Sequence, residues 1–322
     1  MLSMDRRVPE SLTASLQNDG VLHGVLRFVF EDRSVRDLQL RALLGDAAAG
    51  RGTASVYVGM SAVLSVDVSQ RGLRFQTHQS YRGRAPVNLP WNEWLDEETV
   101  SGTARHVEAF LEWSASAVDE RWIRKEGRVH AALAAHDGGT FMPVNREVSV
   151  GFDSTPERDL WTASVLAEME ARLHGDSGVA TKGRFGTGLD ILGVDRRGRV
   201  LAIEAKPAGA AAGIRRGPLQ VWVYAQMMRD WATQQADAPA VISGMAQQRH
   251  RLGLCEPALD PHLPVLIVPV LAIGEGKVNS RALADARSLG ERLSSGSGTG
   301  IEPMELWLLG EHGRVESLEV LS

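Results

Sequence analysis

Cysteine is almost absent from this chain of 322 residues, in which Cys255 is the only one. A single cysteine excludes an intramolecular disulfide and a zinc site built from several cysteines. Long apolar runs are missing too, because the run from Leu263 to Ile273 is broken by Pro264 and Pro269 and is too short to cross a bilayer. Residues 1–19 lack the apolar core of a secretory signal. We therefore expect a cytoplasmic protein with no membrane partner.

An excess of positive charge is also missing, since the formal net charge is -5. Affinity for nucleic acid would have to come from a local basic surface. The stretch from Lys182 to Arg216 is one such region, because it holds eight basic residues and only three acidic ones. The phosphate-contact candidates that it offers are Lys182, Arg184, Arg196, Arg197, Arg215 and Arg216.

The composition, with 43% apolar and 23% charged residues, is that of a globular protein, and the length suits two domains. We predict an N-terminal domain over residues 1–118 and a C-terminal domain over residues 119–322. The first should be a smaller, strand-rich α+β domain with strands at Val25–Phe30, Ser55–Val58, Ala62–Val68 and Leu73–Thr77. Helical spacing predicts a helix around residues 106–117 and a second helix over residues 121–135.

The second half has a different pattern, in which helices alternate with apolar strands. Ser154, Pro156 and Glu157 form a strong helix start, and that helix should run to about His174. A β-hairpin is predicted next, over residues 188–206, and then a helix over residues 214–233. A buried strand (265–271), a helix (280–293) and a final hairpin (304–320) complete an α/β/α sandwich with a mixed central sheet.

The predicted hairpin carries the residues that could take part in catalysis. Residues two apart on a strand share a face, so Glu204 and Lys206 should point the same way, and the hairpin should return Asp190 to their side. Two carboxylates that meet repel each other unless a cation lies between them, and hard oxygen ligands select Mg²⁺ or Mn²⁺. Such a cation can hold a scissile phosphate and make water more acidic, and Lys206 can stabilise the charge that develops.

Asp190, separated by thirteen intervening residues from Glu204-Ala205-Lys206, resembles the active-site motif of the PD-(D/E)xK nuclease superfamily. Gln220 and Tyr224, four residues apart on one helix face, resemble the Gln-x-x-x-Tyr motif of its RecB-like branch. The proline that names the superfamily is replaced by Leu189. The resemblance covers residues 154–231 and implies a restriction-endonuclease-like fold for the C-terminal domain, and the N-terminal domain is then expected to recognise the target or bind a partner.

The resemblance implies a metal-dependent nuclease, with DNA as the first choice of substrate. Asp190, Glu204 and the Ala205 carbonyl would hold Mg²⁺ or Mn²⁺, and Lys206 would serve the attacking water. Gln220 and Tyr224 would position the substrate, and Glu157, with Glu168 in reserve, would supply the family's helical carboxylate. Restriction, antiviral defence and DNA repair are the settings in which such an endonuclease is expected.

Several alternatives stay open at this point. The domain could be a nuclease fold without catalysis, acting as a DNA-binding or scaffold subunit, or it could be a toxin that cleaves RNA. Each charged residue also has a structural interpretation, since a hairpin with charges is usually a solvated edge and Glu157 could simply cap its helix. A homodimer, or a partner protein in a multi-component system, fits the sequence equally well.

Overall fold

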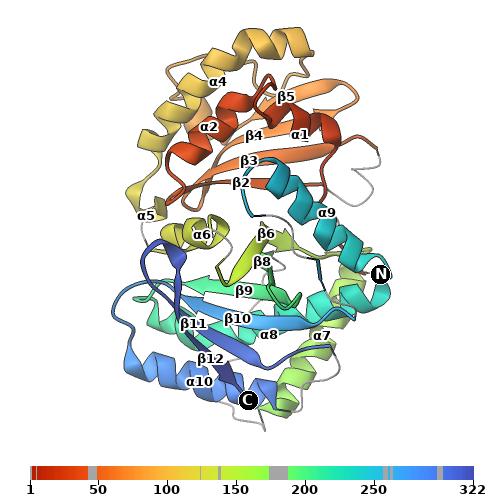
Figure 1. The fold of residues 1–322 in the computed structure, drawn as a ribbon, viewed down its shortest axis with the longest axis vertical. Coiled ribbons are helices and arrows are strands. Elements are labelled where there is room, and N and C mark those ends of the chain that lie inside the picture. Colours follow the sequence, from red (N-terminus) through yellow and green to blue (C-terminus); the bar gives the residue numbers. More distant parts are fainter. Residues whose placement is uncertain are drawn as a thin grey trace. The chain divides into compact units, whose positions relative to one another are not determined.

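A computed structural model describes residues 2–4, 6–42, 49–123, 125–136, 139–173, 188–256, 260–261, 264–295 and 300–322. Internal contacts divide the chain into two compact units, each with its own sheet (Figure 1). The six-stranded unit comprises Met1–Met4, Gly138–Ser243 and Leu259–Ser322, and the four-stranded unit comprises Asp5–Asp137 and Gly244–Ala258. Neither unit is one continuous stretch of chain. The division between them falls inside helix α9 (Ala238–Arg251).

The six-stranded unit is built on a mixed sheet with the strand order β12-β11-β10-β9-β8-β6. Only the β10 pairings with β9 and β11 are parallel. The predicted mixed sheet of an α/β protein is therefore confirmed. Its strands are β6 (Phe141–Ser149), β8 (Gly188–Asp195), β9 (Val200–Lys206), β10 (Ile267–Ile273), β11 (Met304–Leu309) and β12 (Val315–Leu321). A second, two-stranded sheet joins β1 (Leu2–Ser3) to β7 (Gly151–Phe152).

The predicted helix at Ser154 is present as α7 (Thr155–Arg172), and the hydroxyl of Ser154 accepts a hydrogen bond from the Glu157 N–H. The predicted hairpin is present as β8 and β9. Its turn is held by the Asp195 carboxylate, which accepts hydrogen bonds from the N–H groups of Arg197 and Arg199. Gly198 adopts a positive φ of 73° in this turn, a conformation that costs glycine little.

Three helices of this unit pack against one another: α7, α8 (Ala211–Gln234) and α10 (Ser280–Ser294). Helix α8 lies on the sheet so closely that a Cβ atom at Gly217 would be 2.4 Å from the Leu271 side chain. Because Leu271 is paired with Glu204, these two residues share a face of the sheet, and α8 covers that face. None of these three helices forms the second helical layer of the predicted sandwich.

The four-stranded unit contains an antiparallel sheet in which strands follow one another in chain order. The strands are β2 (Arg36–Arg41), β3 (Gly52–Val58), β4 (Ser61–Ser69) and β5 (Gly72–Gln76). The helices are α1 (Glu10–Leu16), α2 (His23–Glu31), α3 (Gln79–Arg82), α4 (Glu97–Ala117), α5 (Glu120–Ile123) and α6 (Glu126–Ala134). One apolar core joins α1, α2 and α4 to the sheet and also includes Leu252 and Leu254.

Two expectations for this part of the chain are wrong. Residues 25–30 are not a strand but the body of α2, because Leu22, Val25, Leu26 and Val29 recur at helical spacing and are all buried. The predicted helix over residues 121–135 is two helices, α5 and α6, and Lys125 between them has a φ of 60° that a continuous helix does not allow. Within the described ranges, no helix is long and apolar enough to cross a membrane.

Candidate active site

Asp190 and Glu204 lie on neighbouring strands of one hairpin. The antiparallel register pairs Ile191 with Ile203, so the next position outward is Asp190 on β8 and Glu204 on β9. Residues in such a position point to the same face of the sheet. The Ala205 N–H donates a hydrogen bond of 2.8 Å to Asp190 Oδ2, which fixes this carboxylate beside β9.

Lys206 belongs to the same group of side chains. Its Nζ lies 2.5 Å from Glu204 Oε1, and both residues are buried, with exposed fractions of 9% and 2%. Helix α8 shapes the other side of the lysine, because a Cβ atom at Gly213 would lie 3.1 Å from Lys206 Cδ. A residue larger than glycine at position 213 would push against the lysine side chain. The structure thus brings Asp190, Glu204 and Lys206 together.

Burial controls the electrostatics of Glu204. Removal from water raises the pKa of its carboxyl group to about 8, and the nearby Asp190 charge adds to this, whereas Lys206 acts in the opposite direction. Glu204 Oε2 is also a buried atom that receives no hydrogen bond within the described part of the chain. The two carboxylates, Asp190 and Glu204, therefore need further positive charge, which either a proton or a cation can supply.

Helix α8 contributes Gln220 and Tyr224 to the same region. Tyr224 is buried, and its pKa is raised by that burial and by the charges of Glu204 and Asp190, while a hydrogen bond with Gln220 acts in the opposite direction. The carboxylates can affect the phenol in this way only if it lies near them. Gln220 is half-buried on the same helix face, one turn earlier. The five residues of the two sequence motifs are thus neighbours.

A backbone oxygen completes the possible ligand set. In a strand, the N–H and C=O of one residue point to the same edge, and the Ala205 N–H points toward Asp190. The Ala205 carbonyl is therefore directed to the same side, beyond Ile191–Ile203, the last pair of the hairpin ladder. Two carboxylates and a carbonyl suit a hard cation, and the unpartnered Glu204 Oε2 fits such an ion. Among the residues with described positions, no group of three His, Cys, Asp or Glu side chains could hold a metal.

The basic candidates are not gathered at this site. Arg196 and Arg197 are exposed in the hairpin turn just beyond β8, and Arg196 is six residues from Asp190, a separation of roughly 20 Å along an extended strand. Arg215 is ion-paired with Asp285 at 3.0 Å, and Arg216 is exposed on the first turns of α8. Lys182 and Arg184 lie outside the described residues.

The helical carboxylates are placed on α7. Glu157 is half-buried in the first turn, where its backbone N–H meets the Ser154 hydroxyl, and its role at the site stays a prediction. Glu168, the reserve candidate, is paired with Arg172 at 2.9 Å. This ion pair gives Glu168 a structural explanation.

Sequence reasoning did not single out Glu147 on β6. The β6–β8 register pairs Arg146 with Ile191 and Val148 with Leu189, so Glu147 occupies the position opposite Asp190. It has a φ of 50°, an unusual conformation for a residue other than glycine. The position of Glu147 opposite Asp190 could not be inferred from the sequence because β6 was not predicted, and a strand must be recognised before its neighbours can be inferred.

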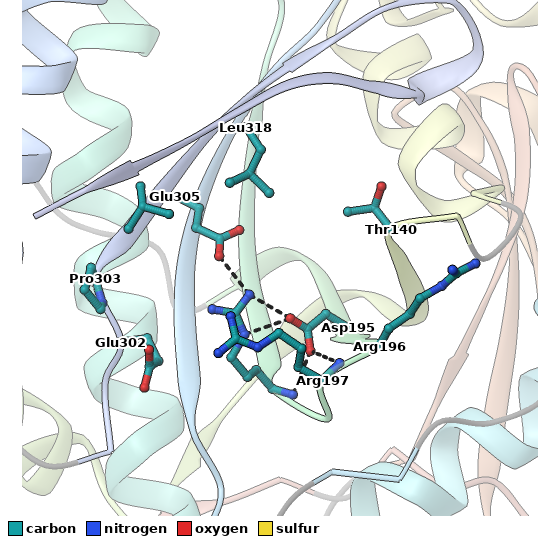
Figure 2. Close-up of a pocket in the computed structure, with 10 residues that line it drawn as sticks. Thr140, Asp195, Arg196, Arg197, Glu302, Pro303, Glu305 and Leu318 are labelled. Atoms are coloured by element: carbon teal, nitrogen blue, oxygen red, sulfur yellow. Dashed lines mark hydrogen bonds and ion pairs between the residues drawn. The ribbon is translucent and has the colours of Figure 1, made fainter.

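A pocket of about 430 Å³ lies elsewhere in the same unit (Figure 2). At its base, Arg199 joins the carboxylates of Asp195 and Glu305, at 2.7 and 2.9 Å. This pairing ties the β8–β9 turn to β11. Asp195 and Glu305 are on strand positions of the opposite parity to Asp190 and Glu204, so the pocket is on the other face of the sheet from the candidate active site.

Comparisons with models of protein families, with curated proteins and with solved structures found no match for this chain. The assignment of an activity therefore rests on the residues and their geometry.

Proposed function

We propose that the six-stranded unit is a metal-dependent nuclease that hydrolyses phosphodiester bonds, with DNA as its substrate. The observation that carries the proposal is the group of Asp190, Glu204 and Lys206, in which Glu204 and Lys206 are buried and one carboxylate oxygen, Glu204 Oε2, has no donor among the described residues. A buried carboxylate beside a second carboxylate is costly to maintain, so the presence of Glu204 next to the half-buried Asp190 favours a functional role over a structural one.

In this proposal, Asp190, Glu204 and the Ala205 carbonyl hold Mg²⁺ or Mn²⁺. Bound there, the cation would supply positive charge to the scissile phosphate and make water a stronger nucleophile. The Asp190 carboxylate is already oriented by the Ala205 N–H. Glu204 would have to be deprotonated to hold the cation, whose charge would then compensate that of the carboxylate.

Lys206 would have a distinct role, because its ammonium group sits beside Glu204 and has no lone pair with which to bind a metal. An ammonium group at this point can orient the attacking water and stabilise the negative charge that develops on the phosphate. Gln220 and Tyr224 can donate hydrogen bonds to phosphate oxygens from the adjoining helix. The buried setting strengthens each of these interactions by excluding water.

The test is incubation of the full chain with supercoiled, linear duplex and single-stranded DNA and with RNA, in Mg²⁺, Mn²⁺ or chelator. We expect cleavage of DNA with either metal and none with chelator. Cleavage of RNA alone would favour the toxin alternative, and no cleavage of any substrate would favour a scaffold subunit.

Metal binding should also be measured without turnover. Titration calorimetry with Mn²⁺ should detect binding to the parent and not to Asp190→Ala. The matched control is Asp285→Ala, which removes a half-buried carboxylate that pairs with Arg215. Equal Mn²⁺ binding by all three proteins would rule out the ligand set.

A further inference from the structure

The outermost strand of the six-stranded sheet has an open edge. Within the described residues, β12 is paired only with β11, so its other edge has backbone N–H and C=O groups without strand partners. Three consecutive residues near the middle of the strand, Glu316, Ser317 and Leu318, are exposed. An edge of this kind can accept a further strand.

The edge is also apolar on one face. Leu318 is 45% exposed and Val320 is 53% exposed, and these two residues are among the few large apolar side chains that are exposed in the described ranges. They lie two residues apart and so share a face, where both line the pocket of Figure 2. Glu319 points to the opposite face and pairs with Arg287 of α10 at 2.8 Å. Exposed apolar neighbours on an unpaired strand are typical of an interaction surface.

We propose that this edge binds the same edge of a second copy of the chain, with the two β12 strands antiparallel. Two identical strands that overlap over their full length must be related by a two-fold axis at the middle residue. In β12, which spans Val315–Leu321, that residue is Leu318. Leu318 therefore lies opposite Leu318 of the second copy.

The remaining pairs of this register place no like charges opposite each other. Glu316 faces Val320, Ser317 faces Glu319, and Val315 faces Leu321, so no acidic residue lies opposite another. A shift that places Glu316 or Glu319 on the axis would put two carboxylates opposite each other, which is unfavourable. The central register also brings the exposed Leu318 and Val320 side chains of both copies into one row. Charge and apolar contact thus favour the same alignment.

The contact is small, because it consists of one strand from each copy. Interfaces below about 1,200 Å² are typical of weak or transient association, so we expect dissociation in the micromolar range or above. The molar mass in solution should therefore rise with concentration from that of one chain to that of two. Light scattering coupled to size exclusion, and sedimentation over a wide concentration range, can follow this change.

Two substitutions at the axis make the test specific. Leu318→Glu and Leu318→Lys each place like charges opposite each other, so each variant alone should remain monomeric. Mixed in equal amounts, they should form a heterodimer, because a glutamate then faces a lysine. The control is Leu160→Glu on α7, where the parent leucine is 75% exposed, and it should associate like the parent.

Circular dichroism should show that all variants are folded, since the changed positions are partly exposed. A parent that is monomeric at every concentration would overturn the proposal. Dimers of Leu318→Glu as stable as those of the parent, or no association in the mixture, would overturn it as well. None of these measurements depends on nuclease activity, so the two proposals fail or stand separately.

Discussion

Substitution of Glu204 by glutamine should stabilise the protein, and increasingly so at higher pH. Glutamine keeps the shape of the side chain and cannot ionise. The ordinary pKa of 4.5 applies to glutamate in the unfolded chain, whereas burial beside Asp190 raises the pKa to about 8 in the folded state. Between these values the folded parent binds more protons than the unfolded one. The contribution of Glu204 to the free energy of unfolding of the parent is therefore fully present below pH 4.5 and is lost as the pH rises toward 8.

The magnitude follows from the same two values. Each pH unit between them is worth about 1.4 kcal/mol, so the loss in the parent approaches about 5 kcal/mol at pH 9. Glu204→Gln avoids this loss. The difference in unfolding free energy between variant and parent should be small near pH 5 and reach several kcal/mol at pH 9.

Urea unfolding at pH 5, 7 and 9 in chelator measures this difference. Glu112→Gln is the control, because Glu112 is exposed on α4, and its effect should not change with pH. A difference between Glu204→Gln and the parent that stays constant from pH 5 to pH 9 would refute the reasoning. Mg²⁺ at pH 8 should stabilise the parent more than the variant, since only the parent offers both carboxylates.

Three further outcomes are expected. Lys206→Met should lower the cleavage rate by a factor on the order of 10² to 10³, while circular dichroism shows an intact fold. A variant that cuts at the parental rate would exclude the lysine from the mechanism. Asp190→Ala should lose cleavage yet bind DNA in chelator at least as tightly as the parent in gel-shift titrations, because one repulsive charge is gone; weaker binding by the folded variant would contradict this. Arg249→Met should lower the free energy of unfolding by about 3 to 5 kcal/mol, because it breaks a buried ion pair with Asp37, and a loss below about 1 kcal/mol in urea would show that the pair contributes little.

Arg249 also shows how an exposed and a buried charge can look alike in a sequence. The run Arg249-His250-Arg251 resembles a solvated helix end. In the structure Arg249 is only 1% exposed, and its guanidinium donates hydrogen bonds to the carbonyls of Leu38 and Ala134. Those acceptors are 211 and 115 residues away in the chain, respectively. No local pattern carries that information.

The placement of Asp190 opposite Glu204 could be predicted from the sequence because it depends on local rules. Strand alternation puts Glu204 and Lys206 on one face, and a tight turn at Gly198 sets the register of the hairpin. The helix start at Ser154 is equally local, since a capping hydroxyl acts within its own first turn. The four-residue spacing of Gln220 and Tyr224 predicted only that the two residues share a helix face.

Other features depend on contacts between distant segments, and only the tertiary structure decided them. Burial of Tyr224 near Glu204 and Asp190 requires α8 to pack on the sheet, and the raised pKa of Glu204 requires water to be excluded from all sides. Residues 25–30 have side chains that suit either a strand or a helix, and packing in a core shared with α1 and α4 selects the helix. Burial is a property of the assembled chain, because each buried surface needs a partner that the local sequence does not contain.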